Sequence, residues 1–185
     1  MHNFIFEEDL SGNIYHELLR YCFRNAAFVL VAITMERLAD SNCQTILNAF
    51  LDLGGTSQRL ARWPGTILCA GKKATVFTVP ISDSLLQMLI DQCPSIFSWR
   101  LPSYPEDLSF IRANGRVLIC TTTHEQYGIL HLNDSEMAEW NRNTFLCKVK
   151  LHDFVESNEM AFSHRLPVAI ASESASSQQC SDNDR

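Results

Sequence analysis

The sequence contains seven cysteines but no closely spaced pair of them. Zinc ribbons and thiol redox motifs need Cys-x-x-Cys spacing, whereas the nearest two cysteines here are Cys22 and Cys43. An odd number of cysteines in a chain of 185 residues also argues against a disulfide framework. We therefore expect no metal and no other cofactor. Most of the thiols should be small buried hydrophobes in a reducing cytoplasm.

Runs of positive charge and long apolar runs are also lacking. Lys and Arg number 15 against 21 Asp and Glu, the formal net charge is -6, and the longest basic run is Lys72-Lys73. Nucleic-acid binding needs clustered Lys and Arg, so nucleic acid is excluded as the main partner. The longest apolar stretch, residues 26–33, is much shorter than the roughly 20 residues of a membrane helix. The acidic first ten residues do not resemble a signal peptide, so we expect a cytoplasmic protein that binds no membrane.

Length and composition predict one domain. A chain of 185 residues, 46% of them hydrophobic, can bury one core of ordinary size but not two. We assign residues 1–155 to a single globular domain and residues 156–185 to a C-terminal extension. From about residue 170 this extension is Ser-rich, polar and without aromatic residues, which is typical of a disordered tail.

Four segments have helical signals. The first has an apolar stripe at helical spacing, made of Tyr15, Leu18, Leu19, Cys22 and Phe23. The expected helix starts, in chain order, are Asn13, the capping box Ser41-x-x-Gln44, Ser82 or Asp83, and Asn133-x-x-Glu136. The pair Gly54-Gly55 should end the second helix.

Strand signals alternate with these helices. Residues 26–34 are apolar and β-branched without alternation, which predicts a strand covered on both faces. Further strands are predicted at 75–79, on both sides of Asn114-Gly115, at 127–132 and at 145–155, while residues 56–66 are predicted to be a polar link. This mixture predicts an α+β (or α/β) sandwich, in which helices pack on a mixed, largely antiparallel sheet.

Asn114-Gly115 lies between two apolar runs and predicts a β-hairpin with a two-residue turn. Such a turn pairs Arg112 with Val117, Phe110 with Ile119 and Leu108 with Thr121. Apolar side chains then fall on both faces, so the hairpin should lie inside the sheet. Its two ends, residues 99–107 and 121–125, should lie side by side, and a functional site is expected there.

Four residues at these ends are candidates for catalysis, namely His124, Glu125, Glu106 and Asp107. An adjacent imidazole and carboxylate can share general acid–base work, and paired carboxylates can divide acid and base roles. The simpler interpretation of His124 is a structural histidine bonded to nearby backbone. For Glu106-Asp107 the simpler interpretation is a solvated position at the entry to a strand.

The familiar catalytic motifs are incomplete or absent in the sequence. His124-Glu125 does not continue into a zinc-protease motif, because Gly128 stands where the second His is required. Residues 65–73 lack the spacing and the Ser or Thr of a phosphate loop, and no Gly-x-Ser-x-Gly elbow occurs. A nucleophilic role for Cys120 beside His124 stays open, although its predicted mid-strand position favours a buried, inert thiol.

Aromatic residues next to prolines supply a candidate binding set. Aromatic side chains usually cover a core, but Trp, Tyr and Arg also concentrate binding energy at recognition surfaces. Arg62 and Arg112 lie close to these aromatics in sequence. The candidate binding residues are Trp63, Trp99, Arg100, Tyr104, Glu106 and Asp107.

Several of these residues fall in a pattern that resembles a family of small, poorly characterised bacterial proteins. The matching segments are Trp63-Pro64-Gly65-Thr66, Ser98-Trp99 to Pro102, Pro105-Glu106-Asp107-Leu108 to Phe110 and Arg112, Asn114-Gly115, and Thr121 to Glu125. The resemblance covers most of residues 10–140, and the sequence beyond Thr144 lies outside it. Some members carry a sporulation label, and the family has no established activity to transfer. The resemblance implies one compact bacterial domain.

Three functions follow as hypotheses. The first is a protein-binding module, such as an immunity protein or antitoxin that inhibits a basic toxin, because an acidic surface complements a basic partner. The second is a hydrolase-like enzyme that uses His124 with a nearby carboxylate. The third is a structural or regulatory domain that forms a homodimer through its aromatic residues.

Overall fold

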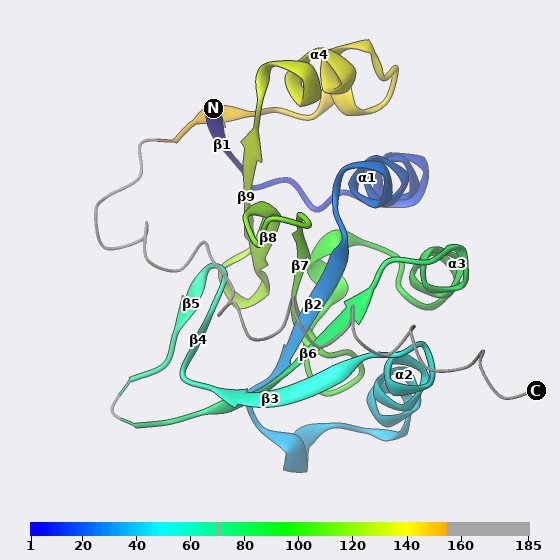
Figure 1. Ribbon diagram of the computed structural model, residues 1–185, viewed down its shortest axis with the longest axis vertical. Helices are drawn as coiled ribbons and strands as arrows, with labels where there is room; N and C mark the ends of the chain where they lie inside the picture. The colour runs from blue at the N-terminus through cyan, green and yellow to red at the C-terminus, as the bar shows by residue number, and fades with distance from the viewer. Residues whose placement is uncertain (70, 155–185) are drawn as a thin grey trace, which may run out of the picture.

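An antiparallel sheet of eight strands is the framework of the protein (Figure 1). The computed structural model describes residues 1–69 and 71–154. The strand order is β10-β1-β9-β8-β7-β2-β6-β3, and each neighbouring pair is antiparallel. These strands are β1 (His2–Phe6), β2 (Phe28–Ile33), β3 (Thr56–Leu60), β6 (Ala74–Pro80), β7 (Glu106–Ile111), β8 (Val117–Thr122), β9 (Tyr127–Leu132) and β10 (His152–Asp153). A separate small hairpin consists of β4 (Arg62–Trp63) and β5 (Thr66–Ile67).

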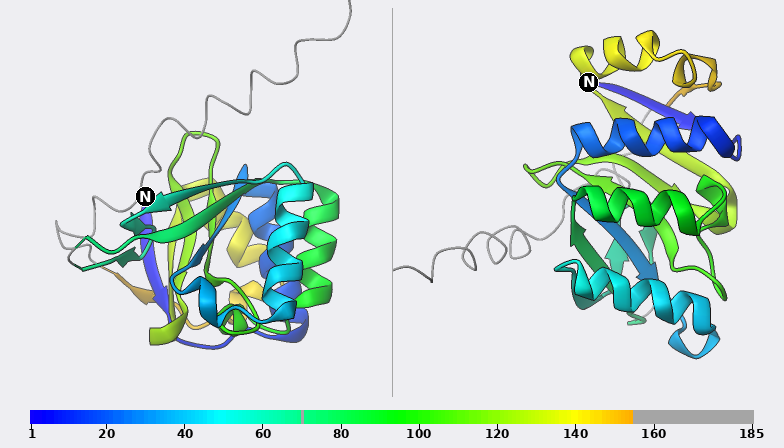
Figure 2. Two further views of the ribbon diagram at one scale, coloured as in Figure 1. Left: turned by 90° about the horizontal axis from the view of Figure 1, so that it is seen from below. Right: turned by 90° about the vertical axis from the view of Figure 1, so that its right-hand side faces the viewer.

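Three helices lie side by side on one face of this sheet (Figure 2). They are α1 (Gly12–Asn25), α2 (Ser41–Asp52) and α3 (Asp83–Gln92), while α4 (Asp134–Arg142) lies beyond the end that carries β1 and β9 (Figure 1). The large apolar core lies between the sheet and these helices. The α+β sandwich predicted from the sequence is therefore confirmed, with every described strand pair antiparallel. In the described chain, no helix has the length and apolar character that crossing a bilayer requires.

A second apolar cluster covers the other face of the central strands. It contains Leu30, Ala32, Trp63, Ala74, Val76, Ile111, Val117, Cys120 and Ile129. Strand β2 thus contributes to both clusters, with Val29, Val31 and Ile33 in the large core and Leu30 and Ala32 in the second. This arrangement confirms that β2, apolar without alternation, is covered on both faces.

The helix starts agree with the predicted signals at three places and differ at one. Ser82 caps α3 by accepting a hydrogen bond from the Leu85 amide, and the capping box of α4 is present in full. The predicted box Ser41-x-x-Gln44 is wrong, because Asp40 is the N-cap of α2 and its carboxylate accepts from two backbone amides. A carboxylate satisfies two orphan donors at a helix start, whereas a serine hydroxyl usually satisfies one.

The hairpin between β7 and β8 is present, but its turn is longer than predicted. Ser109 pairs with Cys120 and Phe110 with Ile119 as expected, after which the register shifts and Ile111 pairs with Val117. Within the turn, Gly115 has a φ of 77° and donates its amide to the Arg112 carbonyl. A turn followed by a left-handed glycine gives a bulge rather than a two-residue turn. The predicted pairing of Arg112 with Val117 is therefore wrong. The Arg112 side chain contacts Glu136 in α4 instead.

Two other segments also differ from their predicted structure. Residues 56–66 contain β3 and most of the β4–β5 hairpin rather than a polar link, because an edge strand with few buried side chains carries no apolar alternation. The described part of the predicted strand 145–155, residues 145–154, does not form one strand. The Asn143 side chain accepts hydrogen bonds from the amides of Phe145 and Leu146 and turns the chain into η4 (Leu146–Lys148). The predicted extension 156–185 and its tail lie outside the described residues.

The close contact between β9 and β1 depends on Gly128. A Cβ atom at Gly128 would lie 2.2 Å from Cζ of Phe6, whose ring is fully buried and stacks on Phe97. We expect Gly128→Ala to lower the free energy of unfolding by about 1–3 kcal/mol, because the phenyl ring cannot move away without overpacking the core. Chemical denaturation of Gly128→Ala, Phe6→Leu and the double variant measures this. The double variant should lose less than the sum of the two single losses, and simple additivity would contradict the steric explanation.

Candidate functional site

Glu106 and Asp107 form the centre of the candidate site, and both are buried. They stand at the start of β7 with 1% and 4% of their surface exposed. The interpretation of this pair as solvated loop residues is therefore wrong. Buried carboxylates are stable only when neighbouring groups donate to them, so their donors define the site.

Asp107 binds three donors from two distant segments. Its Oδ2 accepts from Trp63 Nε1 and from Thr66 Oγ1, at 3.0 Å each, and its Oδ1 accepts from the Thr123 amide at 3.0 Å. Asp107 thereby joins the β4–β5 hairpin to η3 (Thr123–Glu125). The residue has a φ of 60°, a left-handed conformation that Asp and Asn tolerate better than most residues.

The electrostatic environment of Asp107 disfavours its charged form. Burial raises the pKa of its carboxyl group, and the nearby Glu106 charge raises it further. The three donors act in the opposite direction and lower the pKa, but they do not cancel the effect of burial. Two adjacent buried carboxylates are costly, which makes their hydrogen-bond donors important for the stability of this region.

Glu106 joins two further segments. Its Oε2 accepts from the amide of Thr34 at 3.1 Å and also from the Thr34 hydroxyl, just after β2 ends. Its Oε1 contacts His124 Nε2 in η3. Glu106 thus connects the end of β2 to the same short turn that Asp107 holds.

His124 and Glu125 lie on the surface of this turn. The His124 side chain is 63% exposed, whereas its partner, the Glu106 side chain, is 2% exposed. The structure therefore corrects the interpretation that His124 bonds to nearby backbone, because its ring binds a carboxylate. Glu125 is exposed. The pKa of the nearby Tyr127 is raised mainly by burial, and the Glu125 charge raises it by a smaller amount. The predicted proximity of the two hairpin ends is confirmed by the contacts of Glu106 and Asp107 with η3.

The aromatic residues of the candidate binding set lie mostly inside the protein. Trp63 and Trp99 are 2% and 0% exposed, and Trp99 donates its indole N–H to Tyr15 Oη at 2.9 Å. Tyr104 is half-buried and donates to the Gln92 carbonyl, while Arg100 is exposed. The two tryptophans are therefore core residues in this structure, which leaves them no surface for a homodimer contact.

The thiol of Cys120 is also part of the interior. The residue is 1% exposed in β8 and belongs to the second apolar cluster. Burial raises the pKa of the Cys43 thiol to about 11 and that of the Cys93 thiol to about 12, so these two thiols are poor nucleophiles at neutral pH. Among residues 1–69 and 71–154, no group of three or more His, Cys, Asp or Glu side chains is arranged to hold a metal ion.

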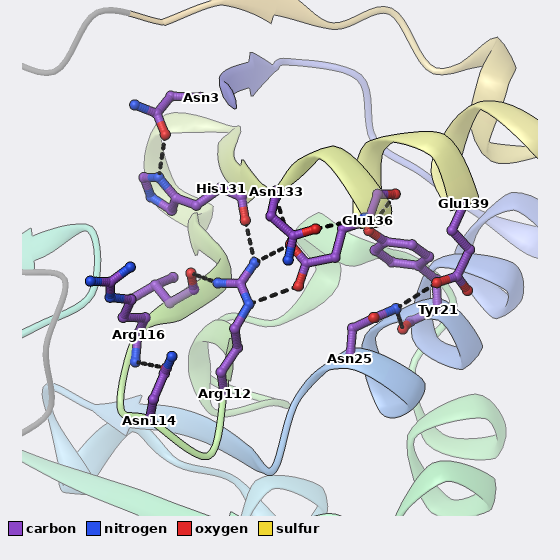
Figure 3. Close-up of polar contacts among 11 residues, drawn as sticks. Asn3, Tyr21, Asn25, Arg112, Asn114, Arg116, His131, Asn133, Glu136 and Glu139 are labelled. Carbon is purple, nitrogen blue, oxygen red and sulfur yellow. Dashed lines mark hydrogen bonds and ion pairs between the residues drawn. The ribbon is translucent and has the colours of Figure 1, made fainter. Parts of the chain in front are cut away.

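A second polar network, which was not predicted from the sequence, is centred on Arg112 (Figure 3). The guanidinium binds Glu136 through two bonds, Nε to Oε1 at 2.9 Å and Nη2 to Oε2 at 2.6 Å. It also donates to the carbonyls of Val117 and His131. Glu136 accepts from the Asn133 amide as well, so this network joins the β7–β8 turn, β9 and the start of α4. The sequence pointed to Glu136 as a capping residue and gave no signal of its bond to Arg112.

Thr34 and Thr66 are the other members of the site that were not predicted. Thr34 is a single hydroxyl residue in a segment without a distinctive motif of its own. Thr66 belongs to the Trp63-to-Thr66 turn of the family resemblance, where it had no assigned role. Comparison of the chain with protein-family models, with curated proteins and with solved structures gives no match.

Proposed function

We propose that this chain is a small, acidic protein-binding module, of the kind that inhibits a basic toxin as immunity proteins and antitoxins do. The observation that carries the proposal is the use of Glu106 and Asp107 as internal anchors. They hold the end of β2, the β4–β5 hairpin and η3 together at one end of the sheet. Binding surfaces are commonly built from loops fixed on a rigid scaffold, since fixed loops lose little entropy on binding.

The charge of the chain supports a basic partner. The formal net charge is -6, and the η3 turn presents the exposed carboxylate of Glu125 to solvent. Complementary charge accelerates encounter and selects among partners, and its effect decreases as salt is added. The proposal places the protein in the cytoplasm, where its buried thiols stay reduced.

A pull-down with the tagged chain from its native cells, followed by mass spectrometry, would identify the partner. We expect a basic protein. With the purified partner, Glu125→Lys should weaken binding about tenfold, because it places a like charge at the interface. The matched control is Asp52→Lys, an equal charge reversal at the exposed end of α2, which should leave the affinity within about twofold. Recovery of the protein alone, or equal effects of both variants, would contradict the proposal.

The Glu106–His124 contact favours a second function, general acid–base catalysis. A carboxylate that binds one ring nitrogen orients an imidazole, and the large exposed fraction of His124 leaves the ring within reach of a substrate. Hydrolysis of a panel of chromogenic esters and phosphodiesters would test this candidate. The wild type should show a rate that His124→Gln abolishes and Glu106→Gln reduces. A rate that is unchanged in His124→Gln would exclude the enzyme hypothesis for that substrate.

A further inference from the structure

The contact between Glu106 and His124 joins a group that water cannot reach to one that water reaches freely. The Glu106 side chain is 2% exposed and the His124 side chain is 63% exposed. Among the described residues, His124 is the one basic side chain within ion-pair distance of Glu106. An exposed imidazole can exchange a proton with solvent, and histidine does so between about pH 5 and pH 8.

We propose that this contact is a proton-operated latch that holds η3 closed against the sheet. With a neutral ring, Nε2–H donates one hydrogen bond to the Glu106 carboxylate, and Nδ1 carries no proton. Protonation from solvent adds a proton at Nδ1 and makes the ring a cation. The contact then becomes an ion pair, in which the attraction between two opposite charges adds to the hydrogen bond that the carboxylate already accepts. The closed turn is therefore favoured at mildly acidic pH and loosened as the pH rises.

The surroundings of the contact support this direction. On β7, Asp107 lies next to Glu106, and the Glu106 charge adds to the larger effect of burial in raising the pKa of Asp107. From α2, Cys43 lies close enough to feel the charges of Glu106 and Asp40, which raise its pKa less than burial does. A protonated His124 offsets the negative charge that gathers at this end of the sheet.

Three further titratable or charged side chains lie near the turn or on the elements around it. Glu125 on η3 and Tyr127 at the start of β9 interact with each other, and Tyr127 also feels Asp107. Arg62 is the charged residue of the β4–β5 hairpin, and it is exposed. None of these three has a hydrogen bond or ion pair to Glu106 among the described contacts, so His124 carries the latch.

Amide hydrogen exchange measures the opening of the turn directly. The amide of Thr123 donates to Asp107, and the amide of Gln126 donates to the Thr123 carbonyl at 3.2 Å. After division by the intrinsic exchange rates, both amides should be about three- to tenfold better protected at pH 5.5 than at pH 8. Equal protection at the two pH values in the full chain would overturn the proposal.

Three variants separate the latch from other titrating groups. His124→Gln keeps a donor that does not titrate, so the pH dependence should disappear, and Glu106→Gln should also remove it. The matched control His152→Gln changes an exposed histidine on β10 and should leave the pH dependence intact. Asp107 remains in every variant, and its protonation would weaken its bond to Thr123, so any opposite trend in His124→Gln belongs to Asp107. An unchanged pH dependence in His124→Gln would overturn the latch.

A spectroscopic measurement on the wild type keeps the test independent of the variants. Nitrogen NMR of the His124 ring at pH 8 should show the tautomer protonated at Nε2, and the tautomer protonated at Nδ1 would contradict the latch. The consequence for a partner rests on the proposed function, since a looser η3 would present Glu125 less well. The exchange experiment needs no partner, so a failed latch and a failed binding function are distinguishable.

Discussion

Replacement of Arg112 with Met is expected to lower the free energy of unfolding by about 3–5 kcal/mol, because it leaves a buried carboxylate without its partner. The side chains of Arg112 and Glu136 are 13% and 7% exposed and share two bonds in a fork (Figure 3). Met keeps much of the apolar stem of Arg, so the loss of unfolding free energy measures mainly the contribution of the guanidinium group. The carbonyls of Val117 and His131 would also lose a donor.

Urea denaturation of a short series of variants measures this effect and divides it. Arg112→Lys should lose less than Arg112→Met, because an ammonium keeps the charge but cannot form the planar fork. The double variant Arg112→Met with Glu136→Leu should recover part of the loss, since no unpaired charge remains buried. It should still be less stable than the wild type by roughly 1 kcal/mol, because Glu136 also completes the capping box of α4.

Arg116 provides the matched control for this series. It stands on the same turn and is exposed, so Arg116→Met should change the stability by less than about 0.5 kcal/mol. A loss from Arg112→Met as small as that of Arg116→Met would contradict a stabilising role for the buried fork. A double variant less stable than Arg112→Met would show that Glu136 has other essential partners.

Arg112 also illustrates what the sequence can and cannot predict about the fold. Local signals located the hairpin, the helix stripes and the capping box Asn133-x-x-Glu136, because each of these depends on residues a few positions apart. The turn at Asn114-Gly115 was predicted, but its bulge was not. That single-residue shift moves Arg112 out of the predicted strand pairing and toward Glu136.

The candidate site was predicted to the same extent and for the same reason. Pairing across the hairpin placed residues 106 and 107 beside the η3 turn, and the structure confirms these contacts. The partners Thr34, Trp63 and Thr66 come from other parts of the chain. The strand order that brings them together depends on the packing of the whole sheet, which no short motif encodes.

Burial was the least predictable property of the site. Paired acidic residues after a proline usually face water, but here both are buried. Three neutral donors bind the Asp107 carboxylate. Thr34 and His124 bind the Glu106 carboxylate. Aromatic residues beside prolines are compatible with a surface rim or a core. Trp63 belongs to the core because Asp107 provides an acceptor for its indole N–H.

The same carboxylate supports the second large prediction, in which Asp107→Ala lowers the free energy of unfolding by about 3–5 kcal/mol. Three buried or half-buried donors would lose their acceptor, from Trp63, Thr66 and Thr123. Ala also tolerates the left-handed φ of 60° less well than Asp, which adds about 1 kcal/mol. Asp107→Asn should lose less, about 1–2 kcal/mol, because Asn accepts this backbone conformation and retains one acceptor oxygen.

The pH dependence of the Asp107→Asn variant identifies the charge as well as the hydrogen bonds. Burial raises the pKa of Asp107 in the folded protein above its value of about 3.9 in the unfolded chain, so folding is favoured while the group is protonated. That contribution is fully present below the unfolded value and is lost as the pH rises through the folded one. Asn has no such contribution, so the cost of Asp107→Asn should be larger at pH 4 than at pH 7.5.

Asp40→Asn is the control with the opposite sign. The Cys43 amide, the Ser103 hydroxyl and the Asn42 amide lower the pKa of Asp40, with the Cys43 amide as the largest cause. The contribution of Asp40 is present above its unfolded value of about 3.9 and is lost as the pH falls through its lower folded value, so the cost of Asp40→Asn should be at most slightly smaller at pH 4 than at pH 7.5 and should shrink strongly only below pH 4. Urea midpoints of the wild type and both variants at the two pH values measure these trends. If the cost of Asp107→Asn also shrinks at pH 4, then Asp107 is stabilised as an anion, and the hydrogen bonds from Trp63, Thr66 and Thr123 outweigh its burial.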